Sequence, residues 1–361
     1  MDNKDTLEFL PHLIAWEVTR RCNLNCLHCR AGAQNKRYPN ELTTEQCYRL
    51  LDNIVSFARP IIILTGGEPM LREDIFEIAA YGSKLDLRMV LATCGMLIDD
   101  DAAKKMIASG IQCISVSIDG ASAPSHDGFR RVDGAFIAAM AAIETAKRNN
   151  LAFQINTTIT KHNLSELSDI MRLAEQLGAV TFNPFLLVPT GRGKELADQE
   201  ISPEQYEQVL QWLSKQRDKS NFQVRVTCAP HYQRILRQNP LPNNQNSNTN
   251  RSRFTPAGCM GGKSFAFISH IGKVQICGFL ETEAGDLQQN NFNFADIWDN
   301  SEFLRQIRQV DNYRGKCGYC PYRRICGGCR ARAHALTGDY LESEPFCIYQ
   351  PKPERTPTID K

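Results

Sequence analysis

The sequence contains no hydrophobic run long enough to cross a membrane and almost no excess of charge. Its 361 residues include 42 Lys and Arg against 40 Asp and Glu, which gives a net charge of +2. No apolar stretch approaches the roughly 18 residues of a membrane-spanning helix, and residues 1–13 lack the apolar segment of a secretory signal. Near neutrality also argues against nucleic acid or another polyanion as the main partner. We therefore expect a globular, cytoplasmic protein without a membrane span.

Cysteine, by contrast, is abundant, with 14 residues in the chain. In a chain without an export signal, this number indicates metal binding in a reducing compartment rather than disulfides. Three of them stand as Cys22-x3-Cys26-x2-Cys29, directly after a strand-like run. Three thiolates at this spacing can hold a [4Fe–4S] cluster through three irons, which leaves the fourth iron open to a small molecule, as in catalytic metal sites. The alternative is a zinc site with His28 as a fourth ligand.

Between residues 13 and 227, strand-like runs alternate with amphipathic, helix-like segments. We expect strands at 13–19, 60–64, 87–92, 113–118, 152–160, 181–187 and 222–227. We expect helices from Thr43 onward, where Thr43-x-x-Gln46 resembles a capping box, and over 73–81, 99–108, 135–148, 164–177 and 203–216. Six or seven such units predict a parallel sheet covered by helices, and they are too few for a complete eight-fold barrel. We therefore predict an α/β fold with a partial, open (β/α)6 barrel. In barrels the chemistry lies at the carboxyl ends of the strands, where the cysteine loop would lie.

Side chains alternate between polar and apolar along two of these strands. The polar sets are Cys113, Ser115, Ser117 and Asp119 in one strand and Gln154, Asn156 and Thr158 in the other. An apolar face toward the helices and a polar face toward the interior predict a lumen that holds a polar ligand.

The pattern changes beyond residue 230, and the chain is long enough for two domains of about 150 residues. Residues 240–252 are polar and of low complexity, which indicates a linker. Short strands at 265–268 and 273–276 follow, with dense cysteines. We predict a barrel over 1–230, a linker over 231–258 and a metal-binding domain over 259–361. A region this irregular has little core, so bound metal must supply much of its folding free energy.

Seven cysteines lie in this second field, more than one metal site can use. They are Cys259, Cys277, Cys317, Cys320, Cys326, Cys329 and Cys347. Two sites are therefore needed, and eight thiolates would fill two cubane clusters, with Cys228 as the natural eighth ligand. A zinc ribbon built on the two Cys-x2-Cys pairs is the alternative. Cys47, Cys94 and Cys113 are interpreted as core residues.

Together these motifs resemble the radical S-adenosylmethionine (SAM) superfamily with a C-terminal SPASM domain. Besides the triad, the resemblance rests on Gly66-Gly67-Glu68-Pro69 after the second predicted strand and Ser117-Ile-Asp119-Gly120 after the fourth. It implies that SAM binds the open iron through its amino and carboxylate groups. One electron then cleaves SAM to methionine and a 5′-deoxyadenosyl radical, which abstracts hydrogen from an unactivated C–H bond in a site that excludes water.

The resemblance also implies which residues bind SAM and the clusters. The SAM contacts would be Gly66, Gly67 and Glu68 near the amino group, Ser117 and Asn156 near the ribose and carboxylate, and His28, which stands where an aromatic residue is common. His28 would stack on adenine, approach the substrate or simply pack, and we expect packing. The implied ligands are Cys228, Cys259, Cys277 and Cys329 for one auxiliary cluster and Cys317, Cys320, Cys326 and Cys347 for another, which makes three [4Fe–4S] clusters in all. Thr93-Cys94-Gly95 departs from the usual Thr-Asn-Gly.

Nearly the whole chain resembles one branch, the heme synthases of the siroheme-dependent route. The stretches that carry this are Ile14–Arg20, His28–Ala31, Phe153–Thr158, Phe185–Lys194, Cys228–Tyr232 and Cys326–Arg332. The branch implies iron-coproporphyrin III as substrate and oxidative decarboxylation of two propionates to vinyl groups, with one SAM consumed for each. It also implies a low-potential electron donor and an electron acceptor. Cationic side chains suit the substrate's carboxylates: the candidates are Arg21, Arg30, Arg192 and Lys194, with His231 as a candidate near the substrate iron.

Three alternatives remain open. The first is a sibling radical SAM enzyme that removes acetate side chains from a siroheme derivative. The second is a SPASM maturase of a peptide or protein, against which we weigh the 21 residues before Cys22, too few for an added leader-binding domain. The third is an iron–sulfur electron carrier or zinc-binding module, for which the strand–helix units around a polar lumen would be superfluous.

Overall fold

The computed structural model describes residues 9–217, 219–240 and 258–352. In these residues one ten-stranded sheet runs in the order β10-β9-β8-β1-β2-β3-β4-β5-β6-β7. Its parallel strands are β1 (Leu13–Thr19), β2 (Ile61–Gly66), β3 (Arg88–Thr93), β4 (Ile111–Ser117), β5 (Ala152–Ile159), β6 (Thr181–Leu186), β7 (Gln223–Val224) and β8 (Phe265–Ile268). β9 (Lys273–Cys277) and β10 (Leu280–Asp286) continue the sheet in antiparallel order.

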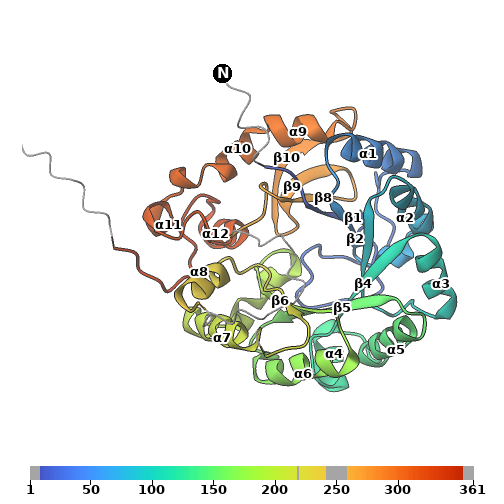
Figure 1. Ribbon diagram of the computed structural model, residues 1–361, viewed down its shortest axis with the longest axis horizontal. Helices are drawn as coiled ribbons and strands as arrows, with labels where there is room; N and C mark the ends of the chain where they lie inside the picture. The colour runs from blue at the N-terminus through green and yellow to red at the C-terminus, as the bar shows by residue number, and fades with distance from the viewer. Residues whose placement is uncertain (1–8, 218, 241–257, 353–361) are drawn as a thin grey trace, which may run out of the picture.

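Helices cover the outside of the curved sheet, as the predicted partial barrel requires (Figure 1). They are α1 (Thr44–Phe57), α2 (Ile75–Lys84), α3 (Asp100–Ala108), α4 (Ala123–Arg130), α5 (Ala135–Arg148), α6 (Leu167–Leu177) and α7 (Pro203–Gln216). Short 3-10 turns lie at Pro69–Leu71, Leu164–Glu166 and Gly191–Gln199. The α/β partial-barrel prediction is confirmed. Among the described residues, no helix is long and apolar enough to cross a membrane.

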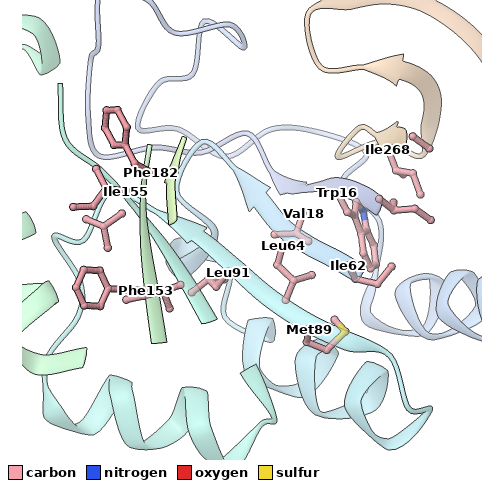
Figure 2. Close-up of a cluster of buried hydrophobic side chains, with 14 of the residues drawn as sticks. Trp16, Val18, Ile62, Leu64, Met89, Leu91, Phe153, Ile155, Phe182 and Ile268 are labelled. Carbon is pink, nitrogen blue, oxygen red and sulfur yellow. The ribbon is translucent and has the colours of Figure 1, made fainter. Parts of the chain in front are cut away.

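Local sequence explains where these elements begin and which face they bury. α1 begins at the predicted capping box, in which the Gln46 N–H donates to Thr43 Oγ1 (3.3 Å) and the Thr43 N–H to Gln46 Oε1 (2.9 Å). Between sheet and helices lies the main core, which includes Trp16, Ile62, Leu64, Leu91, Ile155 and Phe182 (Figure 2). On β5, Phe153, Ile155 and Ile159 are buried there, whereas Gln154, Asn156 and Thr158 are partly exposed on the other face. The predicted alternation therefore holds on this strand.

The C-terminal region adds its strands to the barrel sheet. β8 pairs in parallel with β1, with Leu13 opposite Phe265 and Trp16 opposite Ile268. A partial barrel leaves β1 as an open edge with unpaired backbone groups, and β8 covers that edge. Beyond the sheet lie α9 (Phe294–Asn300), α10 (Glu302–Arg308), a 3-10 turn (Val310–Asn312), α11 (Gly315–Tyr319) and α12 (Arg330–Thr337).

The structure differs from the expected elements in three places. Residues His231–Gln238, placed in the linker, form helix α8, which lies against α7; there the Tyr232 hydroxyl donates to the Leu213 carbonyl (3.4 Å). α4 was not predicted, because Pro124 and Gly128 are poor helix formers. The strand expected at 222–227 is only two residues long, since Pro184 on β6 has no N–H to continue the ladder. Residues 241–252 of the low-complexity stretch, and the linker from there to residue 257, lie outside the described residues.

Candidate active site

The three cysteines of the triad lie in the loop that follows β1. Cys22 and Cys26 are buried and Cys29 is half-buried. Each sulfur accepts one N–H: from Leu24 to Cys22 (3.4 Å), from Ala33 to Cys29 (3.4 Å), and from the Arg130 guanidinium to Cys26 (3.6 Å). Such donors stabilise sulfur ligands and tune the reduction potential of an iron–sulfur cluster.

These thiols need a cation to become thiolates. Burial raises the pKa of Cys22 to about 12, and burial also raises the pKa of Cys26. Without a metal both would stay protonated at neutral pH, and iron would stabilise the thiolate form. The donor set therefore fits an iron–sulfur cluster. In the described part of the chain, no three His, Cys, Asp or Glu side chains are arranged to hold a single metal ion.

The turn after β2 approaches the triad loop so closely that only glycine fits. A Cβ atom on Gly66 would lie 2.1 Å from the Thr19 carbonyl oxygen, and one on Gly67 would lie 2.3 Å from that of Arg21. The turn is fixed by hydrogen bonds from the Gly67 N–H to Thr19 O (2.9 Å) and from the Glu68 N–H to Arg21 O (2.8 Å). The two glycines thus bring the ends of β1 and β2 together beside the triad.

Glu68 is fully buried, and its carboxylate serves the scaffold. It accepts hydrogen bonds from the N–H groups of Cys94 (2.7 Å) and Met70 (3.0 Å) and from the Thr93 hydroxyl (2.9 Å). Burial raises the pKa of Glu68 despite these donors. The contact of this segment with SAM stays a prediction, and the structure gives the Glu68 side chain a second role as the link between β2 and β3.

Asp119 and Arg130 form a buried ion pair beside the triad. Asp119 accepts the Thr158 N–H (2.6 Å), and Arg130 reaches Cys26. Ser117 and Asn156 are neighbours across β4 and β5, and both are partly exposed. The motif at Ser117–Gly120 directed attention to Asp119, but sequence reasoning did not find that Arg130 joins it to the cysteine loop.

His28 is packed against an aromatic ring. Its imidazole stacks on Phe129 with ring centroids 4.4 Å apart, and Phe129 stacks in turn on His162 (5.3 Å). Burial lowers the pKa of His28 to about 3, so the ring is neutral. Its Nδ1 atom is buried without a hydrogen-bond partner. The packing role that we expected is the one visible here, and a contact with SAM stays a prediction.

The five candidate substrate residues differ in what they touch. Arg192 donates to the carbonyls of Cys26 (2.9 Å) and Ala33 (2.7 Å), so it braces the triad loop. Arg30 pairs with Glu17 (3.0 Å) and lies 4.4 Å from the Phe267 ring centroid, while its Nη2 atom is buried without a hydrogen-bond partner. Arg21 donates to Asn35 (3.0 Å), and Lys194 is exposed.

His231 lies elsewhere, in a buried polar network of the C-terminal region. Its Nδ1 atom is 3.1 Å from the Tyr206 hydroxyl, its Nε2 atom contacts Glu344, and it borders Cys347. These partners occupy both ring nitrogens, so the geometry supports a role beside the cysteines more than one at a substrate.

Eight further cysteines gather in two groups. Cys228 lies near Cys259, Cys277 and Cys329; burial raises its pKa, and these neighbouring thiols raise it further. In the second group, Cys326 lies near Cys317 and Cys347, and so does Cys320. A cavity is lined by all four thiols of the second group, together with residues such as His231, Arg234 and Tyr349. Buried and half-buried thiols gathered in fours fit the donor set of a cubane cluster.

Comparison with known proteins identifies the family. The model of the radical SAM superfamily matches residues 16–174, and that of SPASM, an iron–sulfur cluster-binding domain, matches residues 259–329. A protein of Methanosarcina barkeri named AdoMet-dependent heme synthase is 47% identical over 343 residues, which are 94% of this chain and 97% of that protein. The chain belongs to the radical SAM superfamily. Membership implies that it is an enzyme that uses SAM and iron–sulfur clusters.

Further relatives show which members of the superfamily this radical SAM protein is similar to. An AdoMet-dependent heme synthase of Nitratidesulfovibrio vulgaris is also 47% identical, over 94% of this chain and 93% of that one. An Fe-coproporphyrin III synthase of Methanosarcina barkeri is 29% identical, over 93% and 87%. The crystal structure of Streptococcus suis SuiB bound to S-adenosylmethionine has a TM-score of 0.71 at 17% identity, covering 95% of this chain and 78% of that one. That likeness supports the fold.

Proposed function

We propose that the protein is a radical SAM heme synthase that decarboxylates two propionates of iron-coproporphyrin III to vinyl groups. The observation that carries the proposal is 47% identity to AdoMet-dependent heme synthases over 94% of the chain, with the triad in place at the strand ends. The relative named Fe-coproporphyrin III synthase, which represents the sibling reaction, is 29% identical.

Cys22, Cys26 and Cys29 would hold the SAM-binding cluster. When bound, that cluster supplies the electron that cleaves SAM. The N–H groups of Leu24 and Ala33 and the Arg130 guanidinium donate to its sulfur ligands. Gly66 and Gly67 let the β2 turn reach the loop, and Asp119 neutralises Arg130, so that the loop carries no unpaired buried charge there. Gly66, Gly67, Glu68, Ser117, Asn156 and His28 are the proposed SAM contacts.

The substrate would lie in the lumen with its carboxylates toward the cations at the strand ends. Arg30 is the strongest candidate, because Glu17 fixes its guanidinium while one nitrogen remains free to donate to a propionate. Arg21 and Lys194 remain candidates at the rim, whereas Arg192 and His231 already have other partners. The electron released with each carbon dioxide would pass to an auxiliary cluster and then to an acceptor.

Two auxiliary [4Fe–4S] clusters are proposed, one on Cys228, Cys259, Cys277 and Cys329 and one on Cys317, Cys320, Cys326 and Cys347. The grouping of thiols supports this division. A low-potential electron donor is required for SAM cleavage. We place the enzyme in the cytoplasm, since its many thiols require a reducing compartment.

The test is an anaerobic assay of the reconstituted enzyme with SAM, a reductant and iron-coproporphyrin III, read by mass spectrometry. We expect two successive losses of carbon dioxide plus two hydrogens, each accompanied by one 5′-deoxyadenosine. A parallel assay with the siroheme-derived substrate of the sibling reaction is the matched control. Turnover of that substrate alone would replace heme synthesis by acetate removal and would keep the radical chemistry.

A further inference from the structure

Four arginines are buried in the described residues, and three of them face a carboxylate. Arg130 pairs with Asp119, Arg234 with Glu207, and Arg332 with Glu344. The fourth, Arg330, is fully buried, and among the described residues it forms no ion pair. A buried charge without a partner is costly, because protein dipoles replace only part of the lost hydration. The position of Arg330 therefore requires a counter-charge other than a carboxylate.

The contacts of Arg330 point to Cys317. Its Nη1 atom donates to the carbonyl oxygens of Tyr340 (3.0 Å) and Glu342 (2.8 Å), and the guanidinium lies 4.5 Å from the Tyr313 ring centroid. Its Nη2 atom donates to the Cys317 sulfur (3.7 Å). The Glu344 N–H donates to the same sulfur (3.4 Å). A thiolate here, and the anionic cluster that it would bind, is the available counter-charge.

Arg332 has a different charge balance, although it is only two residues farther along α12. It pairs with Glu344 (3.4 Å) and donates to the carbonyls of Cys228 (3.1 Å) and Leu187 (2.8 Å). Its positive charge thus faces a carboxylate, Glu344, which also contacts His231. In the motif Cys329-Arg330-Ala331-Arg332, Arg332 lies at the first group of cysteines and faces a carboxylate. Arg330 lies at the second group and faces none among the described residues.

We propose that Arg330 is a positioning residue whose uncompensated charge acts through Cys317 to raise the reduction potential of the second auxiliary cluster. The inference rests on the ligand assignment in the proposed function. Reduction adds one electron to the cluster, and a fixed positive charge favours that form over the oxidised one. No proton moves, since arginine stays protonated. The donor is the substrate radical, which gives up one electron and carbon dioxide as its vinyl group forms. The second cluster would therefore be the preferred resting place of that electron.

The experiment compares Arg330→Gln with Arg330→Lys in anaerobically reconstituted full-length protein. Iron content and electron paramagnetic resonance at fixed potentials give the cluster count and each midpoint potential. For Arg330→Gln we expect the equilibrium constant for reduction of one auxiliary cluster to fall at least tenfold, which lowers its midpoint potential by 59 mV for one electron. Arg330→Lys keeps the charge and loses the guanidinium fork, so we expect its potential to stay near that of the wild type.

Each outcome is decisive. An Arg330→Gln protein with full iron and unchanged potentials would overturn the inference, as would equal shifts in both variants. If Arg330→Gln does not retain its iron, the Arg330→Lys variant decides. A loaded cluster at the wild-type potential in Arg330→Lys supports a role of the charge. Loss of iron in Arg330→Lys as well would show that only the guanidinium geometry matters, and would overturn the inference. A Cys317→Ala protein whose spectrum matches that of the wild type would instead refute the ligand assignment, and with it the basis of the inference.

Discussion

The two cysteine regions of the molecule are held in place in different ways. The triad loop is fixed by backbone hydrogen bonds to the ends of β1 and β2, and its buried cation, Arg130, is already neutralised by Asp119. Around Cys317 the buried apolar cluster consists of Val310, Tyr313 and Cys317, and the neighbouring Arg330 pairs with no carboxylate of the described residues. The first region is a preformed scaffold that accepts a cluster. In the second region, a bound cluster would supply the negative charge that Arg330 lacks, so we regard its metal as part of the fold.

The largest difference between the regions is expected when each loses one thiol. Cys29→Ala should abolish 5′-deoxyadenosine formation, because two thiolates no longer hold the SAM-binding cluster, while thermal stability changes little. Cys317→Ala should remove iron from the second group and lower the melting temperature. It should also reduce product formation much more than SAM cleavage. The measurements are deoxyadenosine and porphyrin product by mass spectrometry, iron content, and thermal unfolding under anaerobic conditions.

Cys113→Ala is the matched control for both variants. Cys113 is buried in β4 and lies in neither cysteine group, so its removal should leave both activities and the iron content near wild type. Deoxyadenosine production by Cys29→Ala would refute the triad assignment. Equal loss of cleavage and product in folded Cys317→Ala protein would show that the two regions do not divide the work as described.

A smaller effect is expected where the scaffold of the first region is made too bulky. Gly67→Ala places a methyl group 2.3 Å from the Arg21 carbonyl oxygen and 2.6 Å from that of Arg20. We expect it to destabilise the protein by about 1–3 kcal/mol and to lower SAM cleavage at least tenfold, because the triad loop must shift. Gly128→Ala, at an exposed position of helix α4 with no described atom near its added methyl group, should stabilise by about 0.5–1 kcal/mol. Denaturant unfolding and deoxyadenosine assays check both, and wild-type cleavage by folded Gly67→Ala would contradict the close-approach argument.

The sequence was sufficient to predict the parts of the molecule that local patterns determine. Hydrophobic periodicity located most barrel strands and helices, and the Thr43–Gln46 box marked the start of α1. The triad, the Gly66–Gly67 turn and Asp119 stand at strand ends because parallel strands place their carboxyl ends together. These features depend on residues within one turn or one strand.

What could not be predicted depends on contacts between distant residues. The pairing of β8 with β1 joins Leu13 to Phe265, and no local pattern signals it. Sequence analysis made Arg192 a substrate candidate and did not single out Arg330. Only the fold shows that Arg192 braces the triad loop and that Arg330 reaches Cys317. His231 is a predicted candidate near the substrate iron, and no local pattern signals that α8 places it beside Glu344 and Cys347. A charged side chain acquires its role from its partner.

A pH-dependent effect on stability is expected at Glu17, where strand β1 meets the turn after β8. Its buried carboxylate on β1 accepts from Arg20 (3.1 Å), pairs with Arg30 (3.0 Å), and lies 2.7 Å from His270 in the turn between β8 and β9. Burial alone would raise the pKa of Glu17, but the charge of Arg30, with His270 and Arg20, outweighs it and lowers the pKa from 4.5 to about 2. The carboxylate thus contributes about 3 kcal/mol of stability.

Because the pKa is lower in the folded protein, this contribution is complete above the unfolded value of 4.5 and is lost as the pH falls toward 2. Glu17→Gln should therefore lower the free energy of unfolding by about 3 kcal/mol at pH 7. The difference from wild type should stay constant from about pH 8 to 5.5 and shrink below pH 4.5, as measured by urea unfolding of wild type and variant in parallel. A gap already closing between pH 8 and 6 would mean that another group titrates at this junction. A difference in unfolding free energy that stays constant over that pH range would support Glu17 as the carboxylate that joins β1 to the turn after β8.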